Sequence, residues 1–165
     1  MTVRRLRVDE VAAWRDVRLR ALADAPDAFE ATHADWLGRP ETAWVERTRA
    51  LAEDDDTVMF VAEEDGVLVG AAGAFLDESA GGLPHLISMW VAPDARGRGV
   101  GRGLTAAVLE WASGHQAPAI RLFVVAGNEA AAALYQGCGF AYTGLEVPMR
   151  RKPELLEREM RRGLD

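Results

Sequence analysis

The most informative feature of this sequence is a glycine-rich segment that joins an apolar strand to a helix. Apolar residues dominate Leu86 to Val91, and Pro93 ends any strand because proline has no N–H for a ladder hydrogen bond. Further along, apolar residues recur at helical spacing, at Val100, Leu104, Ala107, Val108 and Trp111. The sequence therefore predicts a strand, a turn through glycines and the N-terminus of a helix.

A helix that begins after glycines is well suited to bind an anion. Its first N–H groups have no partner within the helix, and the helix dipole places partial positive charge there. Glycine also lets the backbone approach an anion closely. A turn alone rarely needs four glycines, which cost roughly 0.8–1 kcal/mol each inside a helix. The glycines and the neighbouring arginines thus favour a phosphate site, at Arg96, Gly97, Arg98, Gly99, Val100, Gly101, Arg102 and Gly103.

Two other phosphate-binding folds fit this segment less well. The pattern Gly101-x-Gly103-x-x-Ala106 matches a loose dinucleotide fingerprint, which also expects an acidic residue about 20 residues later. Residues 120–123 contain no acid, and the loop lies past mid-chain rather than after a first strand. No Gly-Lys-Ser/Thr element exists, which excludes a nucleoside-triphosphate loop. A dinucleotide-dependent oxidoreductase remains the weaker alternative.

The composition limits which partners and which cellular compartment are expected. A net charge of −7 argues against nucleic-acid binding and suits a positively charged partner such as an amine. The longest apolar run, residues 67–76, is too short to span a bilayer, so we expect no membrane partner. The single cysteine, Cys138, excludes an internal disulfide and favours a cytoplasmic location, and we expect it to be small-residue filler.

The order of the expected elements predicts an α/β fold. Strands are expected over residues 3–8, 57–62, 67–76, 83–91, 119–126, 140–147 and 155–160. Helices are expected after a cap at Asp9, over residues 29–37, from Pro40, from Val100 and after a cap at Asn128. This order predicts one domain over residues 1–165, a three-layer sandwich with a mixed central sheet of about seven strands and helices on both faces.

Two motifs in this order resemble a known family. Arg96-x-x-Gly99-x-Gly101, directly after a strand ending in Val91-Ala92-Pro93, resembles the coenzyme A pyrophosphate loop of the GNAT superfamily of N-acetyltransferases. The run from Asn128 through Tyr135 to Gly139-Phe140 resembles the second signature of that family. The resemblance covers residues 83–140. It implies a GNAT-type fold whose sheet splays at the cofactor site, and acetyl transfer from the co-substrate acetyl-CoA to a primary amine of a small molecule or peptide.

The resemblance also implies roles for particular residues. The loop from Arg96 to Arg102 would hold the pyrophosphate, and Trp90 and Val91 would lie beside the cofactor. An irregularity at Val91 would free an N–H for the thioester oxyanion. Asn128 would bond the pantetheine arm as well as cap its helix. Tyr135, which could equally be a core residue, would protonate the departing thiolate.

Several groups are candidates for the base that deprotonates the acceptor amine. His85 occupies a position where several GNAT enzymes have a glutamate or histidine, and imidazole titrates near neutrality. An equally good interpretation is a partly solvated histidine beside Pro84. His33, Glu78 and ordered water are further candidates. Phe123 replaces a glutamate that some protein-N-terminus acetylating relatives carry, which counts against that branch.

The remaining expectations concern the acceptor pocket and the alternatives. Arg18, on the first helix, needs a partner when buried, and we favour an acidic side chain of the protein over an acceptor carboxylate. Trp36 and Trp44 are expected in the core rather than on the pocket wall. We expect no metal, and the resemblance allows for a homodimer. The main functional alternative is a non-catalytic CoA-binding or regulatory module on the same fold.

Overall fold

The computed structural model describes all 165 residues and contains one seven-stranded sheet. The strands are β1 (Thr2–Arg5), β2 (Thr57–Glu64), β3 (Val67–Asp77), β4 (Leu83–Val91), β5 (Ala119–Val125), β6 (Ala141–Pro148) and β7 (Leu156–Gly163). The α-helices are α1 (Val11–Asp24), α2 (His33–Leu37), α3 (Glu41–Glu53), α4 (Val100–Gly114) and α5 (Glu129–Gly137). Short 3₁₀ turns lie at Pro26–Ala28, Glu78–Ala80 and Pro93–Ala95. No helix is both long and apolar enough to cross a bilayer.

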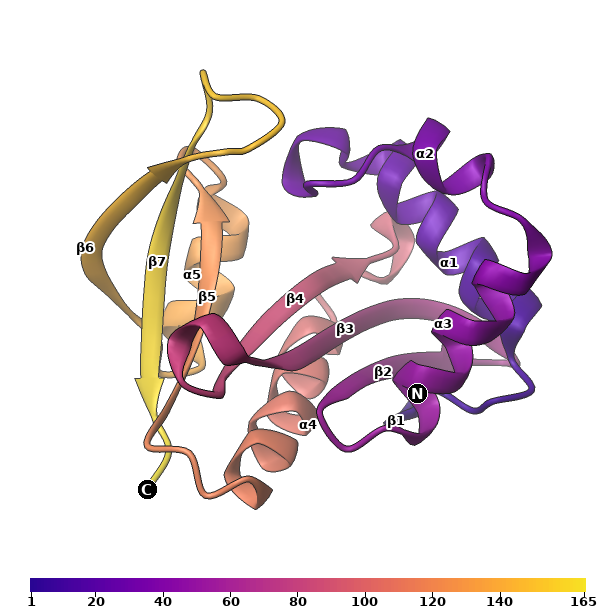
Figure 1. Ribbon diagram of the computed structural model, residues 1–165, viewed down its shortest axis with the longest axis horizontal. Helices are drawn as coiled ribbons and strands as arrows, with labels where there is room; N and C mark the ends of the chain where they lie inside the picture. The colour runs from indigo at the N-terminus through magenta and orange to yellow at the C-terminus, as the bar shows by residue number, and fades with distance from the viewer.

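The sheet has the strand order β1-β2-β3-β4-β5-β7-β6 and is antiparallel except between β4 and β5. The β2–β3 hairpin turns at Asp65 and Gly66, whose φ angles of 49° and 79° match the positive values that tight hairpin turns require. The parallel pair β4 and β5 is in register only at His85 and Arg121, and beyond that point the two strands diverge (Figure 1). The predicted mixed sheet of seven strands and its splay are therefore confirmed.

Helices cover both faces of the sheet, as predicted. In Figure 1, α3 lies in front of β2 and β3, whereas α4 crosses behind these strands and α5 lies behind β5. Residues 68–74 of β3 are all buried, which requires cover on both sides of the strand. At Gly70 an added Cβ would lie 3.1–3.2 Å from side-chain atoms of Leu104 and Val100, so glycine lets α4 pack closely against β3.

Several boundaries differ from the expected ones. The cap expected at Asp9 is wrong: α1 follows Glu10, whose carboxylate instead accepts hydrogen bonds from Arg4 and from the N–H of Arg7. The helix expected over residues 29–37 is only α2, capped by Thr32 through a 3.1 Å bond from the N–H of Asp35. Phe29, four residues before α2, is extended and lines the cleft between β4 and β5. Tertiary packing of one aromatic ring thus overrides the helical pattern there.

Candidate active site

The loop between β4 and α4 presents a row of backbone N–H groups without acceptors in the protein. The first hydrogen bond of the helix runs from the N–H of Gly103 to the carbonyl of Gly99. No backbone or side-chain acceptor receives the N–H groups of residues 97–99, and those of residues 100–102 belong to the first helical turn. These donors and the helix dipole are the features that an anion-binding site requires, and they lie together at the N-terminus of α4.

The glycines of this loop serve two different structural purposes. Gly97 and Gly99 have φ angles of 74° and 85°, which side-chain-bearing residues rarely adopt. Gly101 has helical geometry, and an added Cβ would lie 2.9 Å from a methyl group of Leu134 on α5. The expectation that all of these glycines serve the anion is therefore too simple, because Gly101 is also required for close packing of α4 against α5.

The three loop arginines are not equally free to meet an anion. Arg96 donates from Nε to the carbonyl of Val91 (2.9 Å) and forms an ion pair with Asp24. Arg98 forms an ion pair with Glu64. Arg102 is exposed and forms no ion pair. A ligand anion would thus meet Arg102 directly, whereas Arg96 and Arg98 would have to exchange or share their carboxylate partners.

One backbone N–H of β4, that of Val91, points into the gap where β4 and β5 diverge. The N–H of Ala92 bonds the carbonyl of Val69 on β3, so by strand alternation the N–H of Val91 points to the β5 side, where β4 and β5 no longer pair. The irregularity expected at Val91 lies earlier, because Ser88 and Met89 together oppose one residue of β3 and form a bulge. Ser88 has φ 56°, a strained value for serine. The Val91 N–H is therefore exposed by the splay and not by a bulge.

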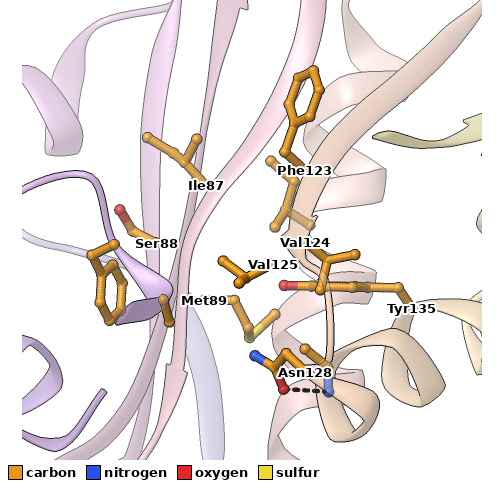
Figure 2. Close-up of a pocket in the computed structure, with 12 residues that line it drawn as sticks. Ile87, Ser88, Met89, Phe123, Val124, Val125, Asn128 and Tyr135 are labelled. Carbon is orange, nitrogen blue, oxygen red and sulfur yellow. Dashed lines mark hydrogen bonds between the residues drawn. The ribbon is translucent and has the colours of Figure 1, made fainter. Parts of the chain in front are cut away.

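Asn128 and Tyr135 both face this opening from the β5 side (Figure 2). Asn128 caps α5, as predicted, by accepting a 3.2 Å bond from the N–H of Ala131 with Oδ1. Its amide nitrogen has no partner in the protein and points toward β4. The hydroxyl of Tyr135 also points toward β4, while its ring packs edge-on against Phe140 (centroids 5.9 Å apart). Burial raises the pKa of Tyr135 above its usual range, which keeps the phenol protonated.

The side chain of Trp90 does not face the opening. Its indole Nε1 donates to Asp24 (2.9 Å), and Arg20 stacks on the ring with its guanidinium carbon 5.3 Å from the centroid. The same Asp24 pairs with Arg96. Trp90 therefore braces α1 and the glycine loop, and it does not line the opening between β4 and β5.

A second pocket of about 330 Å³ adjoins the opening and shares residues 28, 29, 86–88 and 123 with it. His85 lines this pocket between the rings of Phe75 and Phe123, with centroids 5.1 and 5.6 Å away. Burial, then the charge of Arg121, lowers the pKa of His85 to about 4. His85 is thus neutral at physiological pH. Its side chain is about 16% exposed beside the buried Pro84, in line with the partly solvated histidine considered above.

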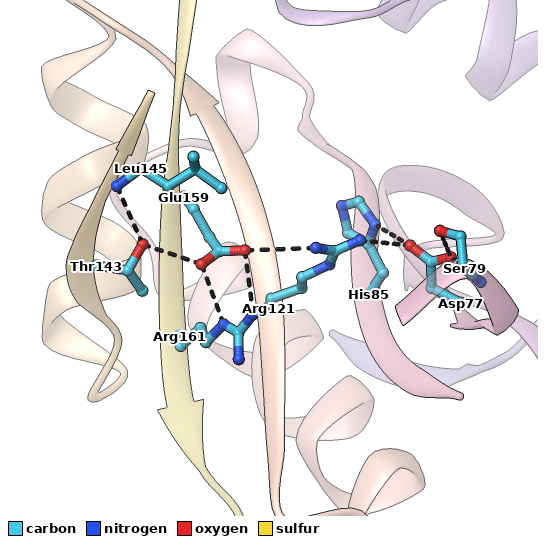
Figure 3. A network of polar contacts seen from close by, with 8 residues as sticks. All are labelled: Asp77, Ser79, His85, Arg121, Thr143, Leu145, Glu159 and Arg161. Atoms are coloured by element: carbon cyan, nitrogen blue, oxygen red, sulfur yellow. Dashed lines mark hydrogen bonds and ion pairs between the residues drawn. The ribbon is translucent and has the colours of Figure 1, made fainter. Parts of the chain in front are cut away.

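A chain of ion pairs ties the strands together below the pocket (Figure 3). Arg121 on β5 bonds Asp77 at 2.5 Å and Glu159 of β7 at 3.4 Å, and Glu159 also accepts bonds from Thr143 and Arg161. Arg121 is also the residue of β5 that is in register with His85. The network therefore joins β3, β5, β6 and β7 at the end of the sheet where β4 and β5 still pair, and leaves the other end free to diverge.

Two carboxylates of the second pocket were missed by sequence reasoning. Glu157 on β7 and Glu30, just before α2, both line it. Burial, then a hydrogen bond and charge repulsion from Glu30, raises the pKa of Glu157 to about 7. The residues are 127 positions apart, and each is an ordinary glutamate in its local context, so no sequence pattern could pair them.

The other candidates lie outside the two pockets or have different partners than expected. His33 and Glu78 line neither pocket. Trp36 and Trp44 are buried against each other with ring centroids 5.1 Å apart, which confirms them as core residues. The acidic partner expected for Arg18 is absent: its guanidinium lies against Ser88 and two aromatic rings.

The sequence matches the acetyltransferase (GNAT) family over residues 21–140. It is 32% identical over 152 residues to a mycothiol acetyltransferase of Acidothermus cellulolyticus, a match covering 84% of this chain and 44% of that relative. A mycothiol acetyltransferase of Streptomyces coelicolor is 31% identical over 131 residues, 78% of this chain and 38% of the relative. The chain thus spans less than half the length of these curated relatives.

Solved structures agree with the fold. A GNAT-family acetyltransferase of Streptococcus pneumoniae superposes with a TM-score of 0.83 at 18% identity, over 99% of each chain. A ribosomal-protein-alanine N-acetyltransferase of Brucella melitensis gives 0.79 at 27% identity, over 99% of this chain and 100% of that one. A Salmonella typhimurium structure that contains acetyl-CoA gives 0.75 at 22% identity, over 100% and 94%. With its splayed sheet and glycine loop, this chain belongs to the acetyltransferase (GNAT) family.

Proposed function

We propose that this chain transfers an acetyl group from acetyl-CoA to a primary amine by direct attack within a ternary complex. One observation carries the proposal: the acceptor-free N–H groups of residues 97–102 lie at the end of β4, where β4 and β5 diverge and Tyr135 and Asn128 face the opening. A candidate anion site, a gap between two diverging strands and a hydroxyl donor therefore occur at the same end of the sheet.

The residues present fit a thioester that carries a diphosphate. The unpaired N–H groups and Arg102 supply donors and positive charge for the diphosphate. The N–H of Val91 and the free amide nitrogen of Asn128 can bond the amides of an extended arm in the splay. Acetyl-CoA supplies the activated acyl group, and the protein's own groups orient it and manage the protons.

The proton balance requires one acceptor and one donor. An acceptor ammonium near pKa 10 must lose a proton before its nitrogen can bond the acetyl carbon, and the C–S bond breaks to leave a thiolate. Tyr135 is the proposed donor to that thiolate, since its phenol stays protonated and points into the splay. This role follows from its position and its protonation together.

Two side chains on the second pocket are candidates for accepting the amine proton. His85 is neutral and available, but with a pKa of about 4 it is a weak base. Glu157, with a pKa of about 7, is better matched to neutral pH. Both line the same pocket, so the pH dependence of the rate distinguishes them.

The test is thiol release from acetyl-CoA with a panel of primary amines, together with calorimetric binding of CoA. We expect binding and amine-dependent release. Acetyl-CoA at 100 times its dissociation constant should stabilise the fold by about 2.7 kcal/mol. Binding without turnover on any amine would favour the non-catalytic module, and no binding at millimolar CoA would refute both proposals.

A pair of glycine variants separates loss of the anion site from general strain. Gly99 and Gly66 have φ angles of 85° and 79°, and an added Cβ meets nothing within 4 Å at either position. Gly99→Ala and Gly66→Ala should therefore cost similar stability, roughly 1–2 kcal/mol each. Only Gly99→Ala should weaken CoA binding, because Gly66 lies in the β2–β3 turn.

A further inference from the structure

Arg18 is a buried cation whose charge no group of the protein neutralises. The residue is only 8% exposed, and its Nε is buried without a hydrogen-bond partner. Its one hydrogen bond runs from Nη1 to the hydroxyl of Ser88 at 3.2 Å. The guanidinium lies 4.8 Å from the ring centroid of Trp36 and 5.2 Å from that of Phe29. A guanidinium offers five N–H donors, so most of this capacity is unused.

The surroundings of Arg18 add positive charge. Burial, then the like charges of Arg47 and Arg39, lowers the pKa of Arg18 to about 10, which still leaves it protonated at neutral pH. Neither Arg39 nor Arg47 forms an ion pair, although the chain as a whole is acidic and most of its other arginines do. Arg18 of α1, Arg39 between α2 and α3, and Arg47 of α3 thus make the electrostatic potential around Arg18 positive, which favours an anion there.

Arg18 lies beside the point of transfer. It lines the second pocket together with Glu157 and His85. Ser88, to which it bonds, lines both that pocket and the opening between β4 and β5. An anionic group held by Arg18 would therefore lie close to the place where the acetyl group and the amine meet. Only a few bonds can separate that anionic group from the reacting nitrogen.

We propose that the acceptor is an amino acid or a similar short amino carboxylate, whose carboxylate binds Arg18 while its amine faces the splay. This inference rests on the proposed acetyl transfer and names its substrate class. A carboxylate matches the planar fork of Arg18 and relieves the uncompensated charge. Phe29, Leu86, Ile87 and Met149 supply apolar wall for a side chain, and the volume of about 330 Å³ suits one of medium size. The carboxylates of Glu30 and Glu157 also line the pocket, and they suit the amine of the acceptor.

The first experiment compares turnover of matched acceptors: L-leucine, L-methionine and L-phenylalanine, each against its amide. We expect kcat/KM to be at least tenfold higher for the acids, and Arg18→Gln to bring this ratio close to one. Arg49→Gln, an exposed arginine of α3 paired with Asp54, should leave the ratio unchanged. Equal or preferred turnover of the amides by the wild type would overturn this inference and leave the acetyltransferase proposal intact.

The second experiment needs no turnover. In the presence of CoA, the N-acetyl derivatives of the three amino acids carry the carboxylate without an ammonium, and we compare their calorimetric dissociation constants with those of the N-acetyl amides. Tighter binding of the acids by tenfold or more supports the inference. Equal binding, or no binding of any acid at millimolar concentration, overturns it. If Arg18→Gln does not fold, this wild-type comparison and Arg18→Lys still decide.

Discussion

The burial of His85 makes a quantitative prediction about acid stability. The imidazole has an ordinary pKa of 6.5 in the unfolded chain and about 4 in the fold, mainly because burial disfavours its charged form. As pH falls below 6.5, His85 becomes protonated in the unfolded chain but stays neutral in the folded chain until the pH approaches 4. Stability is therefore lost between pH 6.5 and 4, and it is fully present above that window.

The size of the effect follows from these two values. Each unit of pKa difference corresponds to about 1.36 kcal/mol, so the full loss below pH 4 is on the order of 3 kcal/mol. At pH 5.0 the unfolded imidazole is almost fully protonated and the folded one is almost neutral, which gives about 2 kcal/mol relative to pH 7.5. For a chain of this size, that corresponds to a melting-temperature change of roughly 4–8 °C.

Urea unfolding of the wild type and of His85→Gln at pH 7.5 and 5.0 measures this contribution. Other groups also titrate in this range, but they titrate in both proteins and cancel in the difference between the two pH-dependent changes. We expect the wild type to lose about 2 kcal/mol more than the variant. An identical loss in both proteins would show that His85 is not buried in its neutral form, and the argument from the Phe75 and Phe123 stack would fail.

Three further changes test the roles assigned around the splay. Tyr135→Phe should lower kcat and leave CoA affinity nearly unchanged, with the exposed Tyr142→Phe as its control; equal turnover would remove Tyr135 from the mechanism. Glu157→Gln should abolish an acidic limb near pH 7 in the kcat/KM profile, because only deprotonated Glu157 accepts the amine proton, and a persisting limb would point to another group. Asn128→Ala should cost about 1 kcal/mol through loss of its cap and also weaken CoA binding. Thr32→Ala removes a comparable cap without affecting CoA, and equal CoA affinity in both variants would contradict the role of Asn128.

Much of the fold was predictable because its signals are local. Alternating and continuous apolar residues predicted all seven strands. Asn128 predicted the start of α5, because its side chain accepts a hydrogen bond from the N–H of Ala131, only three residues along the chain. The failures have non-local causes. The helix expected after Asp9 begins one residue later, after Glu10, whose carboxylate accepts a hydrogen bond from Arg4 of β1. The bulge of β4 fell at Ser88 rather than Val91, because register depends on the pairing with β3.

The candidate site divides in the same way. The candidate anion site could be predicted from the sequence, since its donors, its glycines and its helix belong to one continuous segment. The second pocket, which we propose as the acceptor site, exists only in the folded chain, because Arg18, Ser88 and Glu157 come from α1, β4 and β7. Their chemistry depends on charge in a desolvated space, and desolvation is produced by packing between distant segments. A sequence shows which residues carry charge, but the fold determines which of those charges are left without a partner.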